Sequence, residues 1–175
     1  MRMGVVLGGT LLAACCTQAP PVGAEPAART ASIVITADGI AGFEGDVPFT
    51  LPAIERAFAG MEVVAAPNAD VPAFLVRPPE EATALFVVRP DWTRGYVGSI
   101  AAIVPGASEN IEFQVGVSNA RDTQAVPELA CTEPSGARDG ALVCEASRAA
   151  GVLRFSFRAG KGDPVLDQIA YIPPL

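Results

Sequence analysis

Apolar and polar residues alternate in two segments of the second half of the chain. One segment covers residues 111–115 and the other covers residues 152–158. A period of two is typical of a strand that has one buried and one solvated face. Both segments therefore predict strands, whose core-facing residues would be Ile111, Phe113, Val115, Leu153, Phe155 and Phe157.

Shorter apolar runs, separated by turns that contain Gly or Pro, predict further strands. The run at residues 96–104 pairs naturally with the run at residues 84–89 across a short loop. Consecutive strands joined by short loops favour an antiparallel sheet. The other predicted strands cover residues 33–35, 61–66, 73–77, 141–146 and 167–172.

The best candidate for a helix is residues 51–59. Thr50 stands at the N-cap, a proline follows in the first turn, and Gly60 supplies a C-terminal stop. Residues 122–129 fit either a short helix or an irregular turn. The chain is thus predicted to be a single α+β domain, a largely antiparallel β-sheet with one or two short helices. Apolar spacings of three and four predict that the first helix buries one stripe, formed by Leu51, Ile54 and Phe58.

The first residues resemble a bacterial secretory signal. Arg2 precedes an apolar stretch, and Leu-Ala-Ala stands directly before Cys15. This order resembles the lipobox of bacterial lipoproteins, in which the cysteine becomes the lipidated first residue of the mature chain. An ordinary cleaved signal is the main alternative. A transmembrane helix fits less well, because the apolar stretch is about half of the roughly twenty residues that a membrane span needs.

The sequence predicts three parts: a signal peptide at residues 1–14, an Ala- and Pro-rich tether at 15–31, and a globular domain at 32–175. The prolines of the tether indicate an extended chain that holds the domain away from the membrane. No aspartate follows Cys15, so the usual mark for retention in the inner membrane is absent. We therefore expect a lipid-anchored protein of the cell envelope, at the outer membrane and facing the periplasm.

The charge and the missing histidines exclude several classes of function. Acidic residues number 19 against 12 basic ones, for a net charge of −7, so nucleic acid is a poor partner. Without histidine, imidazole-based triads and most zinc sites are excluded, and we expect neither a metal nor a cofactor. A carboxylate-based hydrolase could use Asp38, Glu44 and Asp46 near Gly-rich turns. Solvated turn acids are far more common, so no catalytic residue is predicted.

Cys131 and Cys144 bracket a polar loop that contains Gly and Pro. In an oxidising periplasm two such cysteines are expected to pair. Closing a loop of this size is worth about 3 kcal/mol in the chain-entropy picture. A metal site would need a CxxC-like spacing or partner histidines, and the sequence has neither. The pattern therefore predicts a structural disulfide.

Residues 90–96, PDWTRGY, form a predicted hairpin loop that holds the only tryptophan of the chain. Exposed aromatic side chains on a loop can stack on sugars or anchor a protein partner. The candidate contact residues are Asp91, Trp92, Arg94 and Tyr96. The alternative, which is the more common outcome for such a residue, is that Trp92 folds back and caps the core, while Asp91 and Arg94 are solvated.

The order of motifs in the second half resembles a known family. A Gly-Val turn at residues 116–117 is followed by Cys131, a polar loop, Cys144, and the alternating strand at 153–157. These motifs look like a family of small bacterial outer-membrane lipoproteins of unknown function, to which the enterobacterial lipoprotein YfeY belongs. The resemblance implies that Cys15 is lipidated and that Cys131 and Cys144 pair, and it brings no catalytic residue. This chain departs from the family in its YIPP ending and its compact loop at residues 160–164.

These observations favour a non-catalytic envelope module that binds a protein or a cell-wall component. Its expected partners are the membrane, through the lipid anchor, and a ligand at the loop that holds Trp92. An alternative is an inhibitor of a basic enzyme that attacks the envelope, such as a lysozyme, since an acidic surface steers basic targets.

Overall fold

The computed structural model describes residues 33–40, 43, 46–67, 70–133 and 141–174. The predicted signal peptide at 1–14, the lipidation site Cys15, the tether at 15–31 and the candidate acid Glu44 lie outside these residues. Within the described part, no helix has the length and apolar character to cross a membrane.

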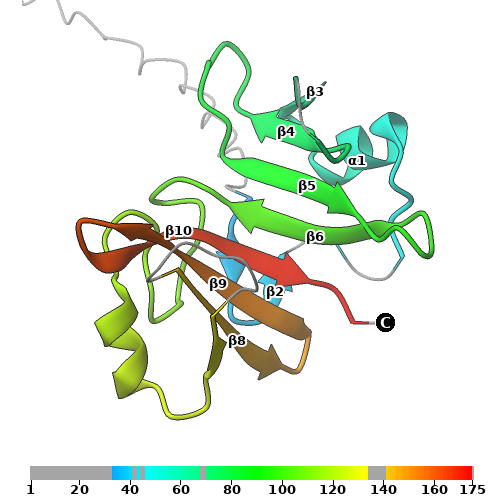
Figure 1. The fold of residues 1–175 in the computed structure, drawn as a ribbon. Coiled ribbons are helices and arrows are strands. Elements are labelled where there is room, and N and C mark those ends of the chain that lie inside the picture. The colour runs from blue at the N-terminus through cyan, green and yellow to red at the C-terminus, as the bar shows by residue number, and fades with distance from the viewer. Residues whose placement is uncertain (1–32, 41–42, 44–45, 68–69, 134–140, 175) are drawn as a thin grey trace, which may run out of the picture.

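An eight-stranded sheet forms the centre of the molecule, and all its strand pairs are antiparallel (Figure 1). The strand order is β3-β4-β5-β6-β10-β9-β8-β7. This confirms the predicted fold class: an α+β domain with a mostly antiparallel sheet, two short helices and one disulfide. The strands are β3 (Glu62–Ala65), β4 (Phe74–Arg77), β5 (Phe86–Pro90), β6 (Val97–Ala102), β7 (Ala130–Thr132), β8 (Leu142–Arg148), β9 (Gly151–Gly160) and β10 (Gly162–Ile172).

The register of the sheet separates a buried face from an outer face. Residues that pair directly across antiparallel strands share one face. The central row of the buried face runs from β4 to β8 through residues that are almost inaccessible to solvent. These are Val76, Phe86, Ala102, Ile169, Phe155 and Cys144. The core therefore lies on one side of the sheet and spans most of its width.

The helix α1 (Leu51–Ala57) covers the β3 end of this face. Ile54 and Phe58 are fully buried, and the ring of Phe58 lies 5.7 Å from the ring of Phe86. Thr50 is at the N-cap as predicted, although its side chain makes no capping hydrogen bond. The prediction for Leu51 was wrong: its side chain is 39% exposed. Leu51 is the first residue of α1, and the buried part of the helix begins after it, at Ala53 and Ile54.

A two-stranded hairpin and a 3₁₀ helix complete the domain. The hairpin strands β1 (Ile35–Thr36) and β2 (Gly39–Ile40) contribute two buried isoleucines to the core. Gly39 has a φ of +103°, and a Cβ there would lie 3.0 Å from the ring of Tyr171, so glycine lets the hairpin pack closely on β10. The 3₁₀ helix η1 (Ala120–Ala125) begins with a capping box between Asn119 and Asp122.

The predicted strand at residues 111–115 is absent from the structure, and that prediction was wrong. Its alternation of burial is nonetheless observed, since Phe113 and Val115 are buried while Glu112 and Gln114 are exposed. The ring of Phe113 lies 4.9 Å from that of Phe155 on β9. The segment therefore lies across the buried face of the sheet and does not extend it.

Candidate functional site

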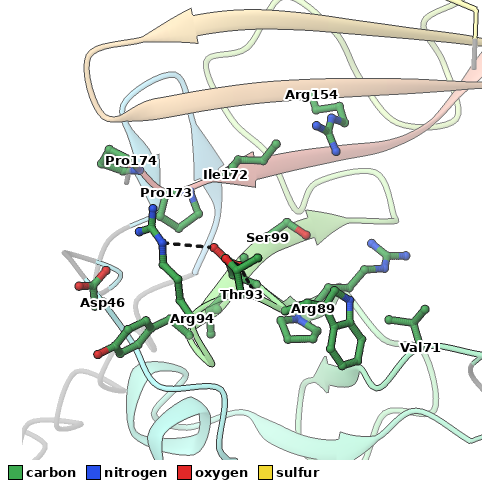
Figure 2. A pocket seen from close by; sticks show the side chains of 16 residues that line it. Asp46, Val71, Arg89, Thr93, Arg94, Ser99, Arg154, Ile172, Pro173 and Pro174 are labelled. Carbon is green, nitrogen blue, oxygen red and sulfur yellow. Dashed lines mark hydrogen bonds and ion pairs between the residues drawn. The ribbon is translucent and has the colours of Figure 1, made fainter.

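A groove of about 420 Å³ lies where β5 turns into β6 and where β10 ends (Figure 2). We call it the Trp92 groove. Its lining combines the predicted hairpin loop with side chains of four strands and with the C-terminal prolines. The lining residues are Asp46, Val71, Arg89, Pro90, Asp91, Trp92, Thr93, Arg94, Tyr96, Val97, Gly98, Ser99, Arg154, Ile172, Pro173 and Pro174.

The loop that carries Trp92 is held by its own hydrogen bonds. The Asp91 carboxylate oxygen Oδ1 accepts bonds from the Thr93 hydroxyl at 2.6 Å and from the Thr93 backbone N–H at 2.9 Å. The bond from the Thr93 hydroxyl has the largest effect and the bond from the Thr93 backbone the next largest, and both hold the pKa of Asp91 below its usual value. The Gly95 N–H donates to the Asp91 carbonyl at 3.0 Å, which closes the turn. The loop therefore has a defined conformation from local interactions.

Backbone contacts also fix the loop to the rest of the domain. The Phe49 N–H donates to the Gly95 carbonyl at 2.9 Å, and the Val97 N–H donates to the Val47 carbonyl at 2.8 Å. On the strand side, Arg89 pairs with Ser99 but Pro90 pairs with Val97, so a β-bulge at Gly98 lies directly behind the loop. The position of Trp92 is therefore set by the bulge and by the segment before α1.

Replacing Gly98 by alanine is expected to displace this loop. An added Cβ would lie 2.6 Å from the Asp91 backbone nitrogen and 2.8 Å from the Pro90 carbonyl carbon. Backbone atoms must then move, at a cost of about 1–3 kcal/mol in the free energy of unfolding. Urea unfolding measures the cost, and the emission of the sole tryptophan reports the movement. Ser99→Ala, one residue away, is the control. Unchanged stability and emission in Gly98→Ala would contradict this account of the bulge.

Trp92 is the most exposed large hydrophobic side chain of the described residues, at 66%. The alternative in which it folds back and caps the core is therefore wrong. The neighbours Thr93 and Arg94 are also exposed, whereas Asp91 and Tyr96 are half-buried. The turn explains this difference, because the bonds from Thr93 fold Asp91 inward and leave the indole at the tip of the hairpin.

Three arginines and two aspartates line the groove. Arg94 lies 3.7 Å from the Asp91 carboxylate, and Arg154 forms a 2.7 Å ion pair with Glu145 on the neighbouring strand. Arg89 makes no ion pair within the described residues. In Figure 2, Arg89 lies on the side of Val71, and Arg94 lies on the side of Asp46.

The structure brings all four predicted contact residues, Asp91, Trp92, Arg94 and Tyr96, to this one groove. Their role as contacts stays a prediction. Sequence reasoning missed the residues that come from the sheet and the C-terminus. One of them had a signal in the alternation: Arg154 stands on β9 between the buried Leu153 and Phe155. Arg89 had no such signal, because it follows a continuous apolar run. Only the strand order and register place them beside the loop.

The acids considered for a hydrolase do not form a desolvated pair within the described residues. Asp38 is exposed in the β1–β2 turn, and Asp46 is exposed at the rim of the Trp92 groove. A carboxylic acid that acts as general acid near neutral pH needs burial or a close second carboxylate to raise its pKa. Neither of these two acids has the required burial.

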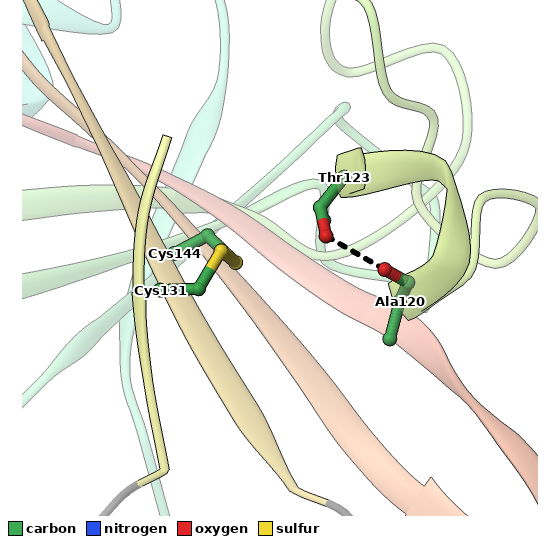
Figure 3. The surroundings of a disulfide bond; sticks show 4 residues. All are labelled: Ala120, Thr123, Cys131 and Cys144. Atoms are coloured by element: carbon green, nitrogen blue, oxygen red, sulfur yellow. Dashed lines mark hydrogen bonds between the residues drawn. A yellow bond between two sulfur atoms is a disulfide. The ribbon is translucent and has the colours of Figure 1, made fainter. Parts of the chain in front are cut away.

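The predicted disulfide between Cys131 and Cys144 is confirmed (Figure 3). It links directly paired residues of β7 and β8. Cys131 is exposed on the outermost strand, whereas Cys144 is fully buried in the core. None of the residues that line the Trp92 groove contributes to it. The bridge is therefore a structural connection at the far edge of the sheet.

No protein-family model matches the sequence, and no curated protein matches it. Among solved structures, the fold is similar to that of the uncharacterized protein yfeY from Escherichia coli, with a TM-score of 0.49 and 14% sequence identity. The match covers 79% of this chain and 99% of that chain. Membership of the lipoprotein family that the sequence motifs resemble stays a prediction. Lipid anchoring and an outer-membrane location stay predictions.

Proposed function

We propose that this chain is a non-catalytic module of the cell envelope, which is anchored by a lipid on Cys15 and binds a protein or a cell-wall component in the Trp92 groove. The observation that supports the binding role most directly is the exposure of Trp92 at a groove. Tryptophan is enriched at interfaces, because its indole combines a large apolar surface with a hydrogen-bond donor. Well-ordered aromatic and arginine side chains are also the groups that most often dominate binding energy.

The geometry of the loop adds a second reason. The turn at Asp91 and the bulge at Gly98 hold the backbone that carries the indole before any partner arrives. A preformed contact loses less conformational entropy on binding than a mobile one. The groove is thus suited to recognition by a rigid tip and a few charged side chains.

Replacing Trp92 by alanine is expected to reduce partner capture about tenfold or more, as for a hot-spot residue. Crosslinking in intact cells and co-sedimentation with isolated cell walls measure protein and wall partners separately. The matched control is Val117→Ala, because Val117 is 64% exposed and lies outside the groove lining. Equal capture by the Trp92→Ala variant would remove the groove from the proposal. Capture of basic lysozymes that disappears at high salt and does not depend on Trp92 would instead support the inhibitor alternative.

Replacing Cys15 by alanine is expected to move the protein from the membrane fraction to the soluble fraction. Lipid chains bind a bilayer with about 0.8 kcal/mol per buried methylene, so more than one chain gives stable anchoring. Cell fractionation and mass spectrometry of the mature N-terminus measure this. The neighbouring Cys16→Ala variant is the control. A wild-type terminus without lipid would contradict the anchor while leaving the groove unaffected.

A further inference from the structure

The Trp92 groove holds an arginine that has no ion-pair partner among the described residues, although the protein as a whole is acidic. The chain has a net charge of −7, yet three guanidinium groups and only two carboxylates line the groove. Two of the arginines are engaged, Arg94 with Asp91 and Arg154 with Glu145. Arg89 is the groove arginine that has no carboxylate within ion-pair distance among the described residues.

Arg89 is positioned by the sheet and does not depend on a mobile loop. It stands on β5 between two neighbouring strands, and its backbone pairs with Ser99 on β6. Its inward neighbour Val88 is fully buried, so the arginine side chain is directed to the outer face and into the groove lining. A half-buried guanidinium with open donors is suited to a carboxylate, which it can bind through two parallel hydrogen bonds.

The rest of the lining combines apolar surface with hydrogen-bonding side chains such as Thr93, Tyr96 and Ser99. Trp92 contributes apolar surface to the lining, together with Val71, Ile172, Pro173 and Pro174. Such a surface can pack against the C–H face of a sugar ring, while a charged group is bound beside it.

The topology disfavours an extended peptide in this groove. Peptides commonly bind sheets by adding a strand to an unpaired edge. The strands that line the groove are β5, β6, β9 and β10, and each lies between two neighbours. The outer edges of the sheet, β3 and β7, contribute no residue to the lining. Recognition by side chains therefore fits this groove better than the addition of a strand.

We propose that the Trp92 groove binds a glycan strand that carries carboxylate groups. Arg89 pairs with a carboxylate of the glycan, and the indole of Trp92 packs against the adjacent sugar ring. This inference rests on the proposed binding function of the groove and names the class of its ligand.

The test uses two tetrasaccharides that differ in their carboxylates. One alternates N-acetylglucosamine and N-acetylmuramic acid, whose lactyl groups carry carboxylates, and the other contains N-acetylglucosamine alone. Because Trp92 is the only tryptophan and is exposed in the groove, its emission reports binding directly. Titration of the full chain with the carboxylated glycan is expected to shift this emission to shorter wavelength. The uncharged glycan is expected to bind at least about tenfold more weakly, as one charge-assisted contact implies.

Two charge-neutralising variants separate the role of Arg89 from net charge. Arg89→Gln is expected to weaken binding of the carboxylated glycan about tenfold and to leave binding of the uncharged glycan unchanged. Arg56→Gln is the matched control, because Arg56 is exposed on α1, makes no ion pair within the described residues and lies outside the groove. It is expected to bind both glycans as the wild type does.

Equal binding of the two glycans, or an Arg89→Gln variant that behaves as Arg56→Gln does, would overturn the carboxylate role. If a glutamate-rich peptide changes the emission and neither glycan does, the ligand class is wrong. If neither glycan binds but Trp92-dependent capture in cells persists, the glycan inference fails and the proposed function stands. If that capture also does not depend on Trp92, both fail.

Discussion

Replacing Phe155 by alanine is expected to lower the free energy of unfolding by about 3–5 kcal/mol. Phe155 is fully buried in the central row of the sheet, between Ile169 on β10 and Cys144 on β8. Phe113 covers its ring from the opposite side, with 4.9 Å between ring centroids. Truncation to alanine removes the contacts of the phenyl ring with these neighbours. Strands held in register cannot close around the gap, so part of the cost is that of a cavity.

Urea unfolding at 25 °C measures this loss. The control is the neighbouring Arg154→Ala, whose side chain is 45% exposed on the other face and pairs with Glu145. Exposed ion pairs contribute little, so the control should lose less than about 1 kcal/mol. A similar small loss for Phe155→Ala would show that this face of β9 is not the core.

This contrast between neighbours explains why β9 could be predicted from the sequence. Leu153, Phe155 and Phe157 are buried, and Arg154 and Arg158 are exposed. Inside a sheet with one covered face, burial alternates with a period of two, and that is a local property of the sequence. The hairpin of β5 and β6 was predictable for a related reason, because its loop and its two apolar runs are adjacent in the chain.

The segment at residues 111–115 shows where local alternation fails. An extended segment that packs across a sheet also buries every second residue, as Phe113 and Val115 do. Whether such a segment is a strand depends on a free edge for its hydrogen bonds. Here β9 already has β8 and β10 as neighbours. Strand order is a property of the whole fold, so the pattern alone could not distinguish the two outcomes.

The candidate site also combines residues that could be predicted from the sequence with residues that could not. The loop with Trp92 could be predicted, because its turn residues and its aromatic side chains are contiguous. The alternation of β9 was sufficient to direct Arg154 outward, whereas Arg89 follows a continuous apolar run that assigns it to neither face. Their meeting with the C-terminal prolines requires β10 to lie between β6 and β9. That non-local pairing brings the cationic side chains to the loop.

Replacing both Cys131 and Cys144 by alanine is expected to lower the free energy of unfolding by about 3 kcal/mol. The bridge closes a separation of 13 residues, for which the chain-entropy model gives a value of about this size. It also holds β7, a strand of 3 exposed residues that pairs only with β8. At roughly 2–4 °C per kcal/mol, the midpoint of thermal unfolding should fall by about 6–12 °C.

Thermal unfolding with and without a thiol reductant tests this expectation, because reduction of the disulfide and replacement of its cysteines should lower the midpoint by the same amount. Reduced wild-type protein should unfold near the midpoint of the double variant, and the variant should not respond to reductant. Cys144 is buried in the core while Cys131 is exposed, so alanine avoids placing a hydroxyl beside Phe155. A variant as stable as the oxidised wild type would show that β7 is held by its backbone pairing with β8 alone. The bridge would then contribute nothing to the stability of this edge.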